Sequence, residues 1–265
     1  MTVLERGPTL LSRQLDERAA ELLRDYLEGL GLHILLATET ESLRAGKDGH
    51  SGADARAGED GYAGADGRAG EDVRLREVVL RDGRTLPADV FLVAAGITPL
   101  VELARESGLE VAKGVVVDDA LRSSDPHVFA VGDVAEHRGR TYGLWPAAVE
   151  QGEIAAENAL GGKRLYEGTV PVTMLKVAGV DLLSIGRFQP QDGDTVIVIE
   201  DSEEHSYRKL VIAEDRIVGA ILIARQQDAP HVTNAVKDGR DVSGLLEALE
   251  RGEWGGLAAQ EPVAA

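Results

Sequence analysis

The chain contains no cysteine, and that absence removes several kinds of redox and metal chemistry. Without thiols the 265 residues form neither a disulfide nor a redox-active dithiol, and they bind neither an iron–sulfur cluster nor a thiolate-held zinc ion. A secretory leader and long apolar runs are also missing, so we expect a cytoplasmic protein. The loop G-x-G-x-x-G, which binds the pyrophosphate of a dinucleotide, occurs nowhere in the sequence.

Basic residues are scarce beside acidic ones, with 28 Lys and Arg against 46 Asp and Glu and a net charge of −18. Nucleic acids and anionic membranes attract clusters of Lys and Arg, so neither is expected as a partner. An acidic surface suits a basic redox partner, but it also serves solubility alone. The hydrophobic fraction of 43% is enough for one or two cored domains.

Residues 115–133 predict two short strands joined by a polar turn. The second strand, residues 127–131, is apolar and ends at Gly132 and Asp133. A strand that ends in Gly-Asp places a carboxylate at the carboxyl edge of a sheet, where open α/β sheets bind ligands. Gly132 lets the backbone approach a bound molecule, and Asp133 can accept hydrogen bonds from hydroxyl groups. A plain β-turn with a solvated Asp is the alternative that this dipeptide alone favours.

The pattern around Asp133 is longer than this dipeptide, and other segments of the chain belong with it. Ser-Asp-Pro at 124–126, followed by VFAVGD at 128–133, resembles the second flavin-binding motif of FAD-dependent pyridine-nucleotide oxidoreductases, in which the Asp hydrogen-bonds the ribityl chain of FAD. Three further segments follow that family's order, at residues 90–99, 145–158 and 173–186. The last of them is similar to the carboxyl-terminal domain of the rubredoxin-reductase and NAD(P)H-nitrite-reductase-like branch. Four motifs in order make the resemblance specific.

The resemblance implies an α/β fold, α+β overall, in which incomplete Rossmann-like NAD and FAD units precede a small interface domain of antiparallel sheet plus helices. The expected domains are a partial NAD(P)-binding domain at 1–96, the second part of an FAD-binding domain at 97–168, the interface domain at 169–254 and a tail at 255–265. In the family the interface domain covers the flavin and often makes a dimer contact. The expected cofactors are therefore FAD and NAD(P)H.

The flavin-binding residues implied by the resemblance are Gly132 and Asp133 together with the helix that starts at Trp145, Pro146 and Ala147. Pro146 suits the first position of a helix, whose positive end would then point at the flavin ring. Trp145 would lie beside the ring, and a core anchor between domains is the alternative interpretation. The residues that follow at 150–151 are expected to be exposed helix positions.

Two residues are candidates for the dinucleotide side. Glu5 ends the apolar, β-branched start of the chain, and without the resemblance it is an ordinary strand-end carboxylate. With the resemblance it has the position of the acid that bonds the NAD ribose, although Arg6 could instead favour a 2′-phosphate. Gly96 closes the apolar run 89–96, which predicts a strand covered on both faces. Small residues there would let the backbone pass close to a dinucleotide, and a tight loop without a ligand is the alternative. No catalytic acid or base and no set of metal ligands is evident.

Residues 44–72 interrupt this pattern. Fifteen of the 29 are Gly or Ala and none is Val, Ile, Leu, Phe or Met, so the segment buries too little apolar area to offset its ordering entropy. It contains the near-repeat GADARAGED at 52–60 and GADGRAGED at 64–72. We expect a flexible surface insertion. A calcium-binding Asp/Gly repeat is the sharper alternative, which the repeat period and the scarcity of apolar anchors disfavour.

These observations favour a role as part of a flavin-dependent NAD(P)H oxidoreductase. That enzyme would pass electrons through FAD to a small redox protein or a nitrite-reducing centre. The chain resembles the carboxyl-terminal part of a longer reductase. Its expected partners are the missing amino-terminal half or a complementing subunit, a small electron carrier and a second copy of itself. A non-catalytic remnant or a dimerisation module without nucleotide loops is the alternative, and a fragment with no independent role is another.

Overall fold

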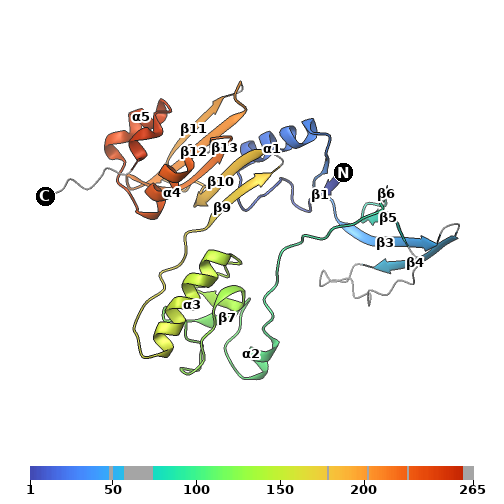
Figure 1. Cartoon of the computed structure of the whole chain (residues 1–265), viewed down its shortest axis with the longest axis horizontal. Coiled ribbons are helices and arrows are strands. Elements are labelled where there is room, and N and C mark those ends of the chain that lie inside the picture. Colours follow the sequence, from blue (N-terminus) through green and yellow to red (C-terminus); the bar gives the residue numbers. More distant parts are fainter. Residues whose placement is uncertain (48–49, 57–73, 178, 202, 226, 259–265) are drawn as a thin grey trace. The chain divides into compact units, whose positions relative to one another are not determined.

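The computed structural model describes residues 1–47, 50–56, 74–177, 179–201, 203–225 and 227–258. The chain divides into two compact units (Figure 1), of which the first combines Met1–Ala95 with Val172–Ala265 and the second is Gly96–Pro171. The first and third predicted domains therefore share one unit, a grouping that the sequence pattern does not predict. The nucleotide-binding roles given to the domains stay predictions.

The first unit begins with a β-α-β element. Strand β1 (Thr2–Leu4) pairs in parallel with β2 (His33–Leu35), and helix α1 (Glu17–Gly29) connects them. The carboxylate of Asp16 accepts the backbone N–H of Ala19 at 3.0 Å, which caps the amino end of the helix as expected. Gly31, at φ +85°, follows its carboxyl end. The apolar spacing of the sequence predicts a helix at 16–30 and a strand at 32–36, and both are confirmed.

The carboxyl-terminal part of the first unit is a five-stranded antiparallel sheet in the order β11-β12-β13-β10-β9. Its strands are β9 (Val172–Val177), β10 (Val180–Gly186), β11 (Thr195–Asp201), β12 (Ser206–Ala213) and β13 (Arg216–Ile223). Helices α4 (Ala229–Lys237) and α5 (Leu246–Glu250) follow it. The predicted antiparallel sheet followed by helices is confirmed.

The two faces of this sheet bury different partners because side chains alternate along each strand. On one face Leu222 of β13 belongs to a core that includes Val232 of α4 and Trp254. On the other face Ile221 belongs to a core that includes the apolar side of α1. The residues of α1 in this second core are Ala19, Ala20, Leu23 and Leu27. Helix α1 therefore packs directly on the carboxyl-terminal sheet.

A polar contact fixes the start of α1 on that sheet. The Asp16 carboxylate accepts the Tyr207 hydroxyl at 2.9 Å and the Lys209 ammonium at 2.7 Å, both from β12. Burial alone would raise the pKa of Asp16, but the hydrogen bonds from Lys209, Ala19 and Tyr207 outweigh it and hold that pKa below the ordinary value. Burial and the same hydrogen bond raise the pKa of Tyr207.

A four-stranded antiparallel sheet occupies the middle of residues 1–95, in the order β4-β3-β5-β6. Its strands are β3 (Thr40–Lys47), β4 (His50–Arg56), β5 (Arg74–Leu80) and β6 (Thr85–Pro87). The pair Asp82-Gly83 is a hairpin turn signal in the sequence. The turn is confirmed, because Gly83 adopts φ +87° and Asp82 accepts the Arg84 N–H at 3.0 Å.

The expectation of a flexible insertion at 44–72 is wrong for its first part. Residues 44–47 continue β3, and β4 pairs with β3 in antiparallel register from Lys47↔His50 to Ser42↔Arg56. Backbone pairing joins β4 to β3, which β5 already holds on its other edge. The rest of the insertion, including the second copy of the near-repeat, lies outside the described residues.

The strand predicted at 89–96 does not form. The segment is irregular, and Val90 and Leu92 are 84% and 85% exposed. A strand buried on both faces needs neighbours along its edges, and no strand pairs with this segment within the part of the chain that the structure describes. The apolar composition of this run is typical of a buried strand, but among the described residues the run joins no sheet.

The second unit packs α3 (Trp145–Ala159) on a short parallel pair, β7 (Val115–Val117) and β8 (Ala135–His137), beside helix α2 (Glu102–Glu106). Its core includes Val117, Leu121, Ala135, Ile154 and Tyr166. Strand β7 and helix α3 confirm the prediction. Among the described residues, no helix is both long and apolar enough to cross a bilayer.

The predicted strand at 127–131 is wrong. Residue Phe129 makes one isolated bridge with Arg122, and the strand beside β7 is instead residues 135–137. Gly132 and Asp133 therefore precede a strand, in a 3-10 turn at Gly132–Val134, and do not end one. Glu136 and His137 explain the shift, because their buried side chains bond the loops on either side of β7.

The contact between α1 and the sheet gives a test of the first unit. We expect Asp16→Ala to lower the free energy of unfolding by about 3 kcal/mol, because it removes the helix cap and leaves the buried Lys209 ammonium without this partner. Asp25→Ala, an exposed position on the same helix, should change little. Urea unfolding at pH 7 and pH 3 measures both.

The effect should also depend on pH. The folded-state pKa of Asp16 is lowered, so its contribution is present above the unfolded pKa near 3.8 and disappears as the pH falls below it. Equal losses at both pH values would contradict the assignment of this contact.

Candidate functional site

The turn Gly132–Val134 rests against the first half of α3. The Gly132 backbone N–H donates to the Gln151 side-chain oxygen at 2.7 Å, and a Cβ on Gly132 would lie 3.5 Å from that of Ala148. Gly132 adopts φ +73°, a left-handed conformation that favours glycine. The next residue, Asp133, is exposed and forms no ion pair within the described chain. An available carboxylate thus stands beside the helix.

Helix α3 presents an open amino end. Its N-cap, Leu144, makes no side-chain capping bond, and Pro146 lies in the first turn as expected. The Trp145 side chain is 83% exposed, whereas Ala147 is buried. Ala147 can therefore offer a ligand only its backbone N–H. An uncapped amino end carries partial positive charge and unpaired N–H groups, which suit a ligand that is or becomes negative.

The two dinucleotide candidates have different surroundings. Glu5 directly follows β1 in the first unit, and one of its carboxylate oxygens already accepts the Gly7 backbone N–H at 2.6 Å. Gly96, the first residue of the second unit, adopts φ +88° and has open space where a side chain would be. The second carboxylate oxygen of Glu5 is not used in that contact, and the backbone at Gly96 has open space beside it.

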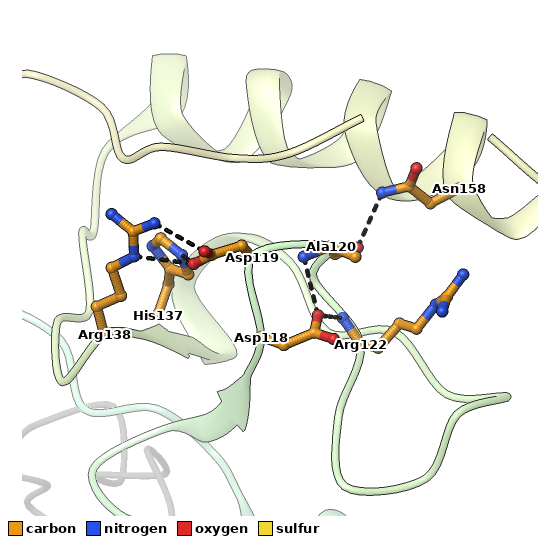
Figure 2. Close-up of polar contacts among 7 residues, drawn as sticks. All are labelled: Asp118, Asp119, Ala120, Arg122, His137, Arg138 and Asn158. Atoms are coloured by element: carbon orange, nitrogen blue, oxygen red, sulfur yellow. Dashed lines mark hydrogen bonds and ion pairs between the residues drawn. The ribbon is translucent and has the colours of Figure 1, made fainter. Parts of the chain in front are cut away.

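Two buried side chains of β8 hold the loops that flank β7. The Glu136 carboxylate accepts the backbone N–H groups of Lys113 and Gly114 at 2.7 and 2.8 Å. On the other side, His137 Nε2 lies 2.8 Å from the carboxylate of Asp119 (Figure 2). Only glycine at position 114 lets the loop before β7 lie this close to β8, because a Cβ there would lie 2.7 Å from the backbone oxygen of Val134.

Asp119 also binds Arg138 through two hydrogen bonds of 2.8 Å, so that both of its oxygens are used (Figure 2). The hydrogen bonds from Arg138, and after them the bond to His137, lower the pKa of Asp119 to about 2. Because this carboxylate is ionised above that pH, His137 Nε2 is the donor in their contact. The other ring nitrogen, Nδ1, is buried and unpartnered among the described residues.

The loop at 118–122 is completed by two further residues (Figure 2). The Asp118 carboxylate accepts the backbone N–H groups of Ala120 and Arg122, each at 2.9 Å. From the end of α3, the Asn158 side-chain amide donates to the Ala120 carbonyl at 3.0 Å. These contacts connect the loop after β7 to both β8 and α3.

Sequence reasoning missed Gln151 and His137. Residues 150–151 were expected to be exposed, but Gln151 has no exposed surface and Glu150 accepts the Thr169 hydroxyl at 2.6 Å. The signal was present, because the helical period puts Gln151 on the same face as the other buried residues of α3, namely Ala147, Ile154, Ala155 and Asn158. The pairing of His137 with Asp119 had no such signal.

The residues of the second unit fit a ligand with hydroxyl groups and a ring that gains negative charge. Asp133 offers free acceptors for hydroxyls, and the start of α3 offers unpaired N–H groups and positive potential. The exposed Trp145 ring adds a flat apolar surface for stacking. FAD has this chemistry, so the residues present are compatible with it.

The fold belongs to a known class of reductases. The solved complex of putidaredoxin reductase with putidaredoxin shares the fold with a TM-score of 0.72 at 22% identity, covering 98% of this chain and 58% of that chain. A family model described as pyridine nucleotide-disulphide oxidoreductase matches residues 1–152, and a model described as the rubredoxin NAD+ reductase C-terminal domain matches residues 171–240. The chain belongs to the pyridine nucleotide-disulphide oxidoreductase family.

Two curated relatives show the branch and the extent of the match. The assimilatory nitrate reductase electron transfer subunit of Bacillus subtilis (strain 168) is 32% identical over 244 residues, which are 92% of this chain and 28% of that protein. The rubredoxin-NAD(+) reductase of Pseudomonas putida is 29% identical over 224 residues, which are 82% of this chain and 51% of that protein. The resemblance seen in the sequence is confirmed, and the chain spans no more than about half of these relatives.

The cluster at Asp119 predicts a pH effect on stability. Its folded-state pKa is lowered to about 2, so the stability from its pairing is present above the ordinary pKa of 3.8 and is lost as the pH falls toward 2. We expect Asp119→Asn to destabilise the second unit at pH 7 and to flatten the decline of the unfolding free energy between those two values. Urea unfolding at several pH values measures the slope. Asp133→Asn, at a carboxylate without an ion pair, is the control, and an unchanged slope in Asp119→Asn would refute the assignment.

Proposed function

We propose that the chain is part of a flavin-dependent NAD(P)H oxidoreductase that passes electrons through FAD to a small redox protein or a nitrite-reducing centre. The observation that carries the proposal is the turn at Gly132, which rests against the first half of α3 and leaves the Asp133 carboxylate exposed. Family membership and relatives named for nitrate-reductase electron transfer and rubredoxin reduction support the same chemistry.

In this proposal the second unit holds part of FAD. Asp133 would accept hydrogen bonds from the ribityl hydroxyls, and Gly132 would let the backbone come close to them. The amino end of α3 at Pro146 and Ala147 would stabilise negative charge on the ring system, with Trp145 beside it. Bound FAD supplies the acceptor for a hydride from NAD(P)H and the donor of electrons to the partner. Glu5 would bond the NAD(P)H ribose, and Gly96 would line the nucleotide path.

The nucleotide phosphates need groups that these residues do not supply. No G-x-G-x-x-G loop occurs in the sequence, and such loops with their helix ends provide most of the binding to a pyrophosphate. We therefore propose that a polypeptide carrying the two glycine-rich loops, either the amino-terminal half of a longer chain or a separate subunit, completes the site. The unpaired apolar run at 89–96 is where an added sheet would attach.

A second candidate function is a non-catalytic interaction module that also forms homodimers. Exposed apolar side chains favour it, because exposed apolar surface marks contact sites. In the first unit they are Val90, Leu92 and Val93, and in the second unit they are Ile97, Leu100 and Leu103. The two candidates differ in a simple property, because a module without a flavin role gains no FAD when its partner is supplied.

The test is a titration of the purified chain with FAD, alone and mixed with a polypeptide that carries both glycine-rich loops. We expect flavin absorbance and NADH oxidation in the mixture. Asp133→Ala should weaken FAD binding by at least about ten-fold, since it removes a charged acceptor from the hydroxyl groups. Glu153→Ala, on the exposed side of α3, is the matched control. A mixture that binds no FAD would favour the interaction module.

A further inference from the structure

The side-chain amide of Gln151 is fully buried in the middle of α3, and only one of its two polar atoms has a hydrogen-bond partner among the described residues. Its side-chain oxygen accepts the backbone N–H of Gly132 at 2.7 Å. Its side-chain nitrogen is buried and has no hydrogen-bond partner among the described residues. A buried donor without a partner destabilises a protein, and methionine or leucine would fill the same space without that cost. The oxygen contact is therefore the reason why an amide suits this position.

Gly132 needs such a restraint more than other residues would. It adopts φ +73° and, as glycine, it has the widest choice of other backbone conformations. Its N–H is the one group in the turn that a side chain of α3 holds, among the hydrogen bonds of the described residues. The peptide plane that follows Gly132 determines the direction in which Asp133 leaves the turn, because each peptide unit is rigid. A contact that fixes the Gly132 backbone therefore also fixes the direction of the Asp133 side chain.

We propose that Gln151 is the positioning residue of this turn: its side-chain oxygen holds Gly132 and thereby aims Asp133 at the polyol chain of the flavin. The part that concerns the flavin rests on the proposed function, whereas the hold on the turn does not. Gln151 touches neither a substrate nor a cofactor in this account. It acts through the backbone of Gly132.

Asn158 provides an internal comparison on the same helix. It is also buried, but its amide donates to the carbonyls of Ala120 and Arg164 at 3.0 and 2.8 Å, and its oxygen accepts the Arg164 N–H at 2.8 Å. Asn158 therefore supports the loop at 118–122 and the end of α3, and no hydrogen bond connects it to Gly132. Its loss should lower stability without moving the turn that carries Asp133.

The experiment compares Gln151→Met, Gln151→Glu and Asn158→Met with the unchanged chain, each mixed with the polypeptide that carries the two glycine-rich loops. FAD is the probe, and the readouts are its dissociation constant, the visible spectrum of the bound flavin and the thermal unfolding midpoint. We expect Gln151→Met to weaken FAD binding about ten-fold and to shift the flavin spectrum, as the loss of one buried hydrogen bond allows. Asn158→Met should lower the midpoint at least as much and leave the spectrum unchanged.

Gln151→Glu keeps the oxygen acceptor and should restore binding, most fully near about pH 5, where a buried carboxylic acid is neutral. Such a rescue would show that the hydrogen bond to Gly132 matters, and not only the volume of the side chain at position 151. If Gln151→Met and Asn158→Met weaken FAD binding equally, or if the glutamate gives no rescue at any pH, Gln151 is a packing residue and the proposal is wrong.

A further readout separates this proposal from the proposed function. Amide hydrogen exchange at Gly132, followed by NMR in the chain without flavin, should be about ten-fold faster in Gln151→Met, because an unpaired N–H opens more easily. If the unchanged mixture binds no FAD but Gly132 responds in this way, the proposed function fails and the hold on the turn stands. Unaltered exchange at Gly132 overturns the positioning role whatever FAD does.

Discussion

One backbone hydrogen bond, from Gly132 to the buried amide of Gln151, connects the sequence motif of this protein to the helix that would serve it. The turn has a glycine in a left-handed conformation and a carboxylate directly after it. Neither would keep a defined direction on an open loop. Because a buried side chain of α3 holds the turn, the backbone before Asp133 is tied to that helix, and the flavin role proposed for Asp133 depends on this contact.

The sheet of the second unit is small. Strands β7 and β8 share three residue pairs, which is too little sheet to be stable by itself. Side chains supply the rest, since Glu136 and His137 bind the loops before and after β7, and Asn158 binds the second of these loops from α3. A unit built in this way depends on buried polar groups with specific partners, which is why its loops could not be placed from apolar patterning.

Local signals predicted much of the fold where the elements stabilise one another within the chain. Helix α1 follows from its cap at Asp16 and its apolar period, and the carboxyl-terminal sheet follows from alternating strands and tight turns. The runs at 89–96 and 127–131 are also apolar, but in the described part of the chain neither belongs to a sheet. Strand propensity expresses packing against neighbours, so these two predictions were wrong. The burial of Gln151 was readable from the helix period, but its contact with Gly132 was not, because it joins residues whose geometry depends on the fold.

The central claim is that the turn at Gly132 is already formed in the chain before any cofactor binds. Hydrogen–deuterium exchange of the purified chain without FAD tests it most directly, with peptides that cover residues 129–140 and residues 88–100. The account predicts slow exchange in the first peptide and fast exchange in the second, whose backbone pairs with no strand among the described residues. Equally fast exchange in both peptides would show that the turn is not held, and it would contradict the account.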